Sequence, residues 1–162
     1  KLSKKDFQTP IGKPVTISRR VNKSVKLSEI EFTKEGNNTI EAGANAVEAP
    51  FIFKHGDYYY LFVSFDYCCR GEKSTYKTVY GRSKNIEGPY LDKTGKPMEH
   101  GGGTFLYGPN SIYFGVGHNS AYHFDGKPYF VSHAYVKAEE GRAKLFIRPM
   151  EFDNDGWIVA GE

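Results

Sequence analysis

The sequence lacks the features that mark several large classes of protein. Its 162 residues include only two cysteines, and these are adjacent, at Cys68 and Cys69. A disulfide-stapled mini-domain needs separated cysteines, and a zinc site needs ligands at wider spacing. No apolar run approaches the roughly 20 residues that a membrane-spanning helix requires. These absences exclude a disulfide scaffold and predict that the chain has no membrane span.

The sequence also has no large excess of charge of one sign, since 22 Lys and Arg are balanced by 19 Asp and Glu, for a net charge of +3. The basic residues are dispersed, apart from Lys4-Lys5 and Arg19-Arg20. A nucleic-acid-binding domain usually gathers its basic residues on one face. We therefore predict an ordinary solvated surface and no nucleic-acid partner. Phosphate-binding glycine loops, Gly-x-Ser-x-Gly elbows and His-Glu-x-x-His motifs are absent as well.

The sequence is rich in aromatic residues and glycine, with 12 Tyr, 12 Phe and 18 Gly. This composition is typical of many short strands joined by tight turns, and it argues against a helical bundle. The sequence therefore predicts an all-β fold.

Two stretches about 70 residues apart resemble each other. Residues 48–64 and 118–133 each read as a strand, a turn at glycine and a second strand that contains Phe-Val-Ser. A repeated all-β unit of this length is typical of propeller blades, which converge on a central axis. The match places Glu48 and His118 at the same position in successive units, facing one shared cavity.

Four strands per unit are expected from the alternating patterns and the turn residues between them. We assign residues 45–162 to two blades and residues 1–44 to the end of a preceding blade. A propeller needs at least four blades, and at about 65–70 residues each the chain supplies about two and a half. The other blades would come from a missing segment or a second chain. The expected strands lie at 14–18, 30–33, 48–54, 57–65, 76–83, 89–91, 104–106, 111–114, 119–124, 127–136, 143–151 and 156–160.

Two residues stand out chemically. Glu48 lies among small and apolar neighbours, where desolvation would raise the pKa of its carboxyl and suit a general acid; the alternative is an exposed glutamate at a strand edge. His118 follows Gly115-Val116-Gly117, whose glycines permit close approach of backbone or ligand. It is either a metal ligand or active-site group, or a half-buried structural histidine. His123 and His133 could join it in a cluster.

Two loops are candidates for binding. Residues 66–71 combine charge, an aromatic ring and the adjacent cysteines, and this loop either binds a ligand or is purely structural. For Cys68 and Cys69 we favour buried, reduced thiols over a vicinal disulfide. The Asp153-Asn154-Asp155-Gly156 stretch lacks the further ligands of a calcium loop and predicts an Asx turn.

Several motifs together resemble the endo-1,5-α-L-arabinanases of glycoside hydrolase family 43, from about residue 45 to the end. The resemblance implies a five-bladed β-propeller and inverting hydrolysis of α-1,5-linked arabinan. It departs from the family at Val116, where a proline is usual, and the aspartates expected on earlier blades are absent. The matching pieces include Glu48-Ala49-Pro50, Cys68-Cys69-Arg70-Gly71, Ser74-Thr75-Tyr76, Gly81-Arg82-Ser83, Gly88-Pro89-Tyr90, Gly101-Gly102-Gly103-Thr104, Gly117-His118-Asn119-Ser120, His133-Ala134-Tyr135 and Asp155-Gly156-Trp157.

The resemblance also implies roles for individual residues. Glu48 matches the general acid, and His118 matches a histidine that holds a central metal, often calcium. The motifs around them imply an extracellular or periplasmic enzyme acting on arabinan polysaccharide or oligosaccharide. The substrate-binding residues implied are Cys68, Cys69, Arg70, Asn119 and Ser120.

Two other functions compete with this one. The chain could be a non-catalytic propeller fragment that binds arabinan or a partner chain, with tyrosine-rich strands stacking on sugars. It could also belong to an enzyme that acts on xylan or arabinoxylan. Aspartates on earlier blades would distinguish the enzyme from the binding fragment.

Overall fold

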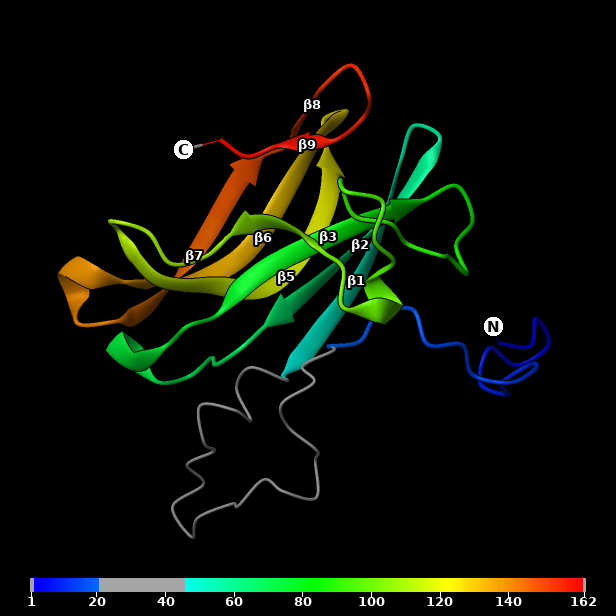
Figure 1. Ribbon diagram of the computed structural model, residues 1–162, viewed down its shortest axis with the longest axis horizontal. Coiled ribbons are helices and arrows are strands. Elements are labelled where there is room, and N and C mark those ends of the chain that lie inside the picture. Colours follow the sequence, from blue (N-terminus) through cyan, green and yellow to red (C-terminus); the bar gives the residue numbers. More distant parts are fainter. Residues whose placement is uncertain (1, 21–45, 162) are drawn as a thin grey trace, which may run out of the picture.

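A computed structural model describes residues 2–20 and 46–161, and this part of the chain is all-β, with no α-helix. Its strands form two antiparallel sheets and a small separate hairpin (Figure 1). The first strand of the second sheet lies against the first three strands of the first sheet. No helix among the described residues is long and apolar enough to cross a bilayer.

The first sheet has the strand order β1–β2–β3–β4: β1 (Val47–His55), β2 (Tyr58–Phe65), β3 (Lys77–Ser83) and β4 (Thr104–Tyr107). The prediction of a fourth strand at 89–91 is wrong. Leu91 makes only isolated bridges to Arg82 and Pro97. The stretch begins at Pro89, which has no backbone N–H to give to a sheet. The edge of the first sheet is β4 instead, paired with β3.

The second sheet has three strands, β5 (Tyr113–Phe124), β6 (Lys127–Val136) and β7 (Arg142–Pro149). The stretches expected at 111–114 and 119–124 join in the single long strand β5. The last expected strand, at 156–160, does not join this sheet. It forms a hairpin of its own, β8 (Glu151–Phe152) with β9 (Ile158–Val159).

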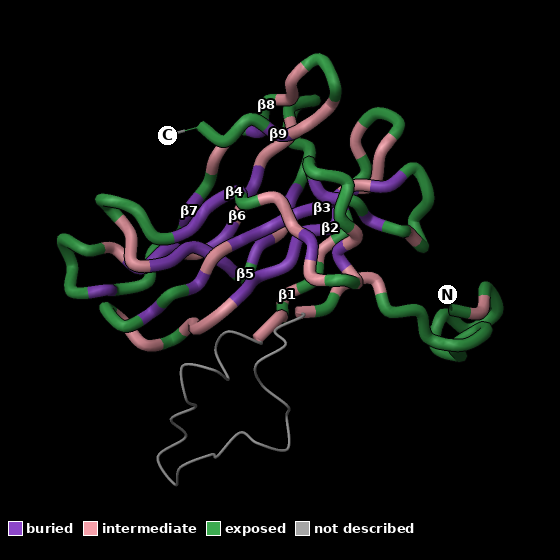
Figure 2. Tube along the Cα trace, viewed as in Figure 1, coloured by how far each residue is buried: buried purple, intermediate pink, exposed green. Residues whose placement is uncertain are grey.

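The core lies between the two sheets, and Figure 2 shows the buried stretches along the middle of the strands. Aromatic rings carry much of it: the Phe62 and Phe130 ring centroids are 5.9 Å apart, and Tyr107 meets Phe146 edge to face at 5.0 Å. Each such side chain contributes about 1.5–3 kcal/mol by leaving water. A second cluster covers the other face of the first sheet and contains Leu61, Val63, Phe65, Val79, Tyr90 and Met98.

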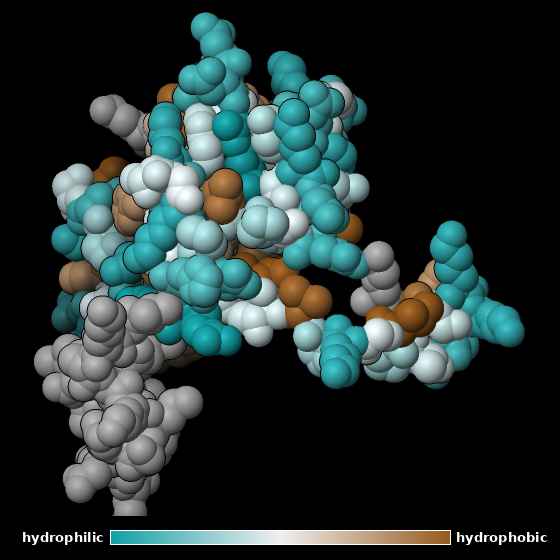
Figure 3. Space-filling view, turned by 45° about the vertical axis from the view of Figure 1, so that its right-hand side comes forward, coloured by the Kyte–Doolittle hydropathy of each residue, from teal (hydrophilic) through white to brown (hydrophobic). Residues whose placement is uncertain are grey.

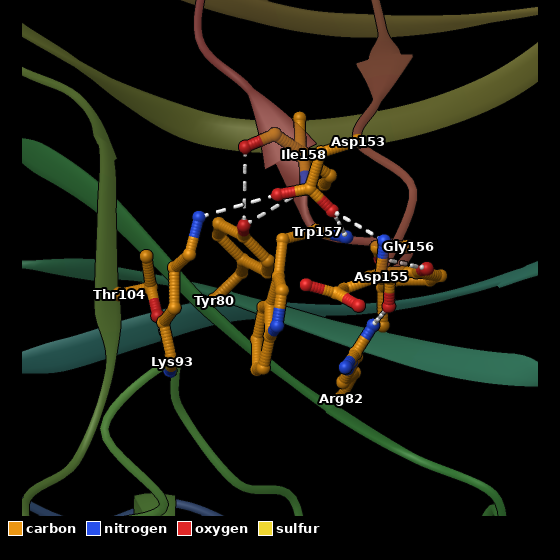
Figure 4. Close-up of polar contacts among 10 residues, drawn as sticks. Tyr80, Arg82, Lys93, Thr104, Asp153, Asp155, Gly156, Trp157 and Ile158 are labelled. Carbon is orange, nitrogen blue, oxygen red and sulfur yellow. Dashed lines mark hydrogen bonds and ion pairs between the residues drawn. The ribbon is translucent and has the colours of Figure 1, made fainter.

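The β8–β9 hairpin is fastened to β3 by the contacts drawn in Figure 4. The Tyr80 hydroxyl accepts a hydrogen bond from the Ile158 N–H (3.0 Å) and donates one to the Ile158 carbonyl (3.3 Å). Within the hairpin, the Asp153 carboxylate accepts from the Asp155 N–H, two residues on, at 3.1 Å, which confirms the Asx turn. The Arg82 guanidinium lies 3.8 Å from the Trp157 ring centroid. These contacts hold the carboxyl-terminal hairpin over the end of the core.

The amino-terminal segment does not form the strand expected at 14–18, because no described residue pairs with it there. Its last described residues contact the rest of the fold: Ile17 packs against the second cluster, and the Arg19 N–H donates to the Met98 carbonyl at 3.0 Å. The Arg20 guanidinium pairs with the Asp66 carboxylate at 2.8 Å and lies over the Phe65 ring. The strand expected at 30–33 lies outside the described residues.

Most of the surface in Figure 3 is hydrophilic, with apolar side chains in small separate groups. The second sheet exposes a larger set of apolar side chains from β5 and β7. Strand pairing places Tyr122 (61% exposed), Leu145 (73%) and Ile147 (47%) on one face of that sheet, away from the core residue Phe130. We call these three residues the open face of the second sheet.

Candidate active site

A β-bulge interrupts the leading strand of each sheet. In β1 the pairing register shifts between Glu48 and Phe51, and Ala49 adopts a φ of +50°. In β5 it shifts between Gly117 and Ser120, and His118 adopts a φ of +55°. Positive φ is uncommon for residues other than glycine. Bulges re-aim side chains, and here they lie beside the two residues singled out from the sequence.

The bulges show that Glu48 and His118 are not equivalent positions. Glu48 pairs with Ser64, the last pair before the bulge, whereas in the second sheet that pair is Gly117 with His133. His118 is therefore equivalent to Ala49, one residue along. The sequence match misaligns the two units because it superposes two turn glycines that occupy different positions in their turns. Gly56 is the first residue of its two-residue turn, and the glycine of the second turn is its last residue.

Glu48 is exposed, which confirms the alternative of an exposed glutamate over that of a carboxyl enclosed by apolar neighbours. Val47 packs against the second buried cluster, so strand alternation places the Glu48 side chain on the opposite face of the first sheet, the face toward the second sheet. The carboxylate nevertheless has a buried partner. The Tyr76 hydroxyl donates a hydrogen bond to Glu48 Oε1, and the Tyr76 side chain is fully buried.

Tyr76 is seated under strand β5. The Val116 N–H donates to the Tyr76 carbonyl at 2.9 Å. A Cβ on Gly115 would come within 2.9 Å of the Tyr76 backbone, and one on Gly117 would collide with its ring. The group that approaches these glycines closely, as the sequence predicted, is therefore Tyr76. Burial raises the pKa of the Tyr76 hydroxyl, and the hydrogen bond to Glu48 raises it further, so the phenol stays protonated.

His118 lies nearby with an exposed side chain, and its backbone N–H donates to Ser64 Oγ at 2.9 Å. Its ring centroid is 6.3 Å from that of His133, which in turn stacks on Tyr76 at 5.8 Å. Burial lowers the pKa of His133, the charge of His118 lowers it further, and Glu48 acts in the opposite direction. His133 is therefore held as a neutral imidazole. The expected third histidine, His123, lies elsewhere, against His55.

The described residues do not form a calcium site by themselves. Calcium takes six to eight oxygen ligands. Among residues 2–20 and 46–161, no three or more His, Cys, Asp or Glu side chains gather where they could hold a metal ion. His118 offers one imidazole nitrogen, so its role as a metal ligand stays a prediction.

The expectation of buried, reduced thiols is wrong, because Cys68 and Cys69 form a vicinal disulfide. Cys69 adopts a φ of +63° and is exposed, so the backbone turns at this point and brings the neighbouring sulfurs together. The Cys69 N–H donates to the Tyr135 hydroxyl at 2.7 Å, and His133 Nε2 lies 3.0 Å from the same hydroxyl. The loop is thus linked to the histidine beside Tyr76. Arg70 stacks on the Tyr67 ring at 3.9 Å.

The two other predicted substrate-binding residues differ in access. Asn119 is only 6% exposed, and neither atom of its side-chain amide has a hydrogen-bond partner in the described structure. Ser120 is half-buried. The structure therefore gathers Glu48, His118 and the Cys68–Cys69 loop around residues that the sequence analysis did not assign a role, chiefly Tyr76 and Tyr135. Tyr76 lies within a recognised motif, but no sequence signal connects it with Glu48.

Comparison with known proteins places this site in a family. Residues 13–158 match the family model described as Glycosyl hydrolases family 43. The chain belongs to glycoside hydrolase family 43. It is 53% identical over 122 residues to an extracellular exo-α-(1→5)-L-arabinofuranosidase of Cellvibrio japonicus. It is 46% identical over 112 residues to an extracellular endo-α-(1→5)-L-arabinanase of Bacillus subtilis.

Solved structures resemble this family 43 chain along almost its whole length. An exo-1,5-α-L-arabinanase from a bovine ruminal metagenomic library matches with a TM-score of 0.82 and 52% identity over 99% of the chain. A Cellvibrio cellulosa α-L-arabinanase complexed with arabinohexaose matches with a TM-score of 0.80 and 42% identity over 97%.

The family 43 chain spans only part of these relatives. It covers 35% and 33% of the Cellvibrio japonicus and Bacillus subtilis proteins, aligning 75% and 69% of its own residues. It covers 47% of each of the two solved chains. The relatives include both exo- and endo-acting proteins, so membership of the family does not decide between these modes.

Proposed function

We propose that this chain is part of an inverting glycoside hydrolase that cleaves α-1,5-linked arabinan. Its relatives are named for that substrate, and one of the similar structures is a complex with arabinohexaose. The observation that carries the proposal is the Glu48 carboxylate, exposed on the surface and held from below by the buried hydroxyl of Tyr76. A carboxyl group that is both accessible and fixed is what a general acid requires.

In the proposed reaction, Glu48 donates its proton to the glycosidic oxygen as the bond from that oxygen to the anomeric carbon breaks. A water molecule attacks the anomeric carbon from the opposite face and loses its proton to a second carboxylate. In inverting enzymes the two carboxyl groups lie roughly 6.5–9.5 Å apart, which leaves room for the water. We propose that the base is an aspartate in the portion of the relatives that this chain does not span.

The substrate would lie across the residues around Glu48. Cys69 exposes part of the vicinal disulfide, and Arg70 is held over Tyr67, so this loop offers an apolar surface beside a cation. We propose Cys68, Cys69 and Arg70 as contacts to arabinan. Ser120 and Asn119 would contribute from the bulge in β5.

His118 would be this chain's ligand to a central calcium or other metal ion. Because the described residues do not complete such a site, the proposed reaction contains no step that depends on the metal. The remaining blades of a five-bladed propeller would come from a further segment or a second chain. The open face of the second sheet supports this, since a neighbouring blade would remove its three apolar side chains from water. The proposed location is extracellular or periplasmic, following relatives named extracellular.

The alternative is a non-catalytic propeller fragment that binds arabinan or a partner chain. It is favoured by the exposed ring of Tyr122 (61% exposed), because an accessible aromatic ring can stack on a sugar. In that case Glu48 has no chemical role, and arabinan binding would survive without hydrolysis.

The decisive variant is Glu48→Gln, made in the protein completed with the portion that its relatives possess. Glutamine can still accept the hydrogen bond from Tyr76 but cannot donate the proton, so we expect hydrolysis of linear arabinan to fall by about 10²–10⁴-fold. The matched control is Glu151→Gln, an exposed carboxylate on β8, which should leave the rate unchanged. If Glu48→Gln kept more than a few per cent of the wild-type rate, the assignment of the acid would be wrong.

A further inference from the structure

The Tyr76 hydroxyl hydrogen-bonds Glu48, which lies 28 positions away in the sequence, and it binds only one of the two carboxylate oxygens. The phenol donates to Oε1, and no other described residue hydrogen-bonds the Glu48 carboxylate. Oε2 therefore has no hydrogen-bond partner among the described residues. A carboxylic acid that serves as a proton donor needs this asymmetry, with one oxygen held and the other carrying the proton.

The donor cannot easily move away. The Tyr76 ring is fully buried, its carbonyl accepts from Val116 at 2.9 Å, and Gly117 leaves no space between β5 and the ring. His133 stacks on the ring at 5.8 Å. A side chain enclosed in this way has a single orientation, so its hydroxyl fixes the position of whatever it binds.

We propose that Tyr76 is a positioning residue for the general acid, holding Oε1 of Glu48 so that the proton on Oε2 points toward the leaving oxygen. This inference rests on the proposed function, in which Glu48 is the acid. The same hydrogen bond strengthens as Glu48 becomes a carboxylate, because a charged acceptor binds a donor more strongly than a neutral one. Tyr76 therefore also stabilises the negative charge that develops on Glu48 during proton transfer.

Other titratable groups around this pair come from neighbouring strands. His133 of β6 lies against the Tyr76 ring and interacts electrostatically with Glu48, and His118 of β5 lies beside His133. Neither donates a hydrogen bond to Glu48. The direct donor among the described residues is Tyr76, so its removal is the informative change.

The test is Tyr76→Phe, which keeps the ring and deletes the hydroxyl. The matched control is Tyr80→Phe, which deletes another buried phenol, on β3, whose hydroxyl bonds to Ile158 and not to Glu48. The pKa of Glu48 is read from the side-chain carboxyl ¹³C signal on titration, assigned with Glu48→Gln. Loss of a charge-assisted donor should raise that pKa by about one pH unit in Tyr76→Phe and leave it unchanged in Tyr80→Phe.

The kinetic readout uses the completed protein and linear arabinan. In Tyr76→Phe we expect kcat to fall about tenfold with little change in KM, because the loss acts in the transition state. The alkaline limb of the pH–rate profile should move to higher pH with the raised pKa of the acid. Thermal unfolding of both variants shows whether each remains folded.

The outcomes separate the two proposals. A Glu48 pKa that does not differ between wild type and Tyr76→Phe would overturn the positioning role. A raised pKa with an unchanged rate would overturn it too, since the contact would then have no catalytic effect. If Glu48→Gln is fully active, the proposed function fails, whereas the titration still reports whether Tyr76 donates to Glu48.

Discussion

His55 Nδ1 lies 3.1 Å from His123 Nε2, and this contact joins the end of β1 to the end of β5 across 68 positions of sequence. One imidazole must donate and the other must accept, so at least one of the two histidines is neutral in the folded protein. Aromatic rings enclose the pair: Phe152 stacks on His55 at 4.2 Å, and Phe53 lies 4.7 Å from His123. The two sheets are thus tied by a contact that double protonation breaks.

We expect the protein to lose stability in mild acid. Burial lowers the pKa of His55, and the charge of His123 lowers it further; burial does the same for His133. With lowered pKa values in the folded state, these histidines take up protons first in the unfolded chain. Stability is therefore fully present above the unfolded pKa of about 6.5 and is lost as pH falls from there through the lower pKa values of the folded state. Melting temperatures measured by circular dichroism across this range check the direction.

The variant His55→Phe isolates one contribution, because phenylalanine can still stack on Phe152 but cannot be protonated. Its melting temperature should depend less steeply on pH than that of the wild type. His100→Gln is the control, since the His100 side chain is 68% exposed, and it should keep the wild-type slope. Equal slopes in His55→Phe and wild type would show that His55 does not contribute.

Gly117→Ala should destabilise the protein by about 1–3 kcal/mol, because the added methyl group meets the buried ring of Tyr76. The ring cannot yield without disturbing the core or its bond to Glu48. Urea unfolding measures the loss. Gly161→Ala is the matched control, since a Cβ there meets nothing within 4 Å, and its midpoint should stay at the wild-type value. Equal midpoints for the two variants would contradict the close contact.

The long strands could be predicted from the sequence because their residue pattern is strong. The expected strands at 57–65 and 127–136 match Tyr58–Phe65 and Lys127–Val136 almost to the residue. They are rich in Tyr, Phe and Val and are bounded by turn residues. The fourth strand of the first sheet could not be found in this way. The chain at 89–91 has the right composition, but pairing with β3 is decided by the loop that returns at Thr104–Tyr107.

The site was only partly predictable. Glu48 and His118 could be selected because each is chemically unusual in its local sequence. Their surroundings depend on bulges with positive φ at Ala49 and His118, and alanine gives no signal of such a conformation. The contact from Tyr76 follows from this tertiary geometry, as does the redox state of the cysteine pair. Such features depend on how the strands pack in three dimensions, and local sequence patterns do not determine that packing.

The vicinal disulfide predicts a specific result in alkylation. Unfolded protein treated with iodoacetamide in the absence of a reductant should gain no mass, because neither Cys68 nor Cys69 has a free thiolate. After reduction both should be alkylated, and the intact mass should rise by two carbamidomethyl groups. Addition of two groups without reduction would show that the cysteines are thiols.

Arg82→Lys should weaken the attachment of the β8–β9 hairpin. The guanidinium lies between the rings of Trp157 (3.8 Å) and Tyr58 (4.2 Å) and donates to the Asp155 carbonyl. Lysine keeps the charge but loses the planar stacking, so we expect a loss of about 1–2 kcal/mol in urea unfolding. Trp157 is the only tryptophan in the chain, so its emission should shift to longer wavelength as the ring becomes more exposed.

The matched control for this change is Arg142→Lys, because the Arg142 side chain is 73% exposed. It should alter neither the emission nor the unfolding midpoint. Figure 4 shows that the hairpin is also held by Tyr80 and by the ion pair between Lys93 and Asp153, so the hairpin should stay attached in Arg82→Lys. Emission identical in Arg82→Lys and wild type would mean that the stacked guanidinium adds nothing to the position of Trp157.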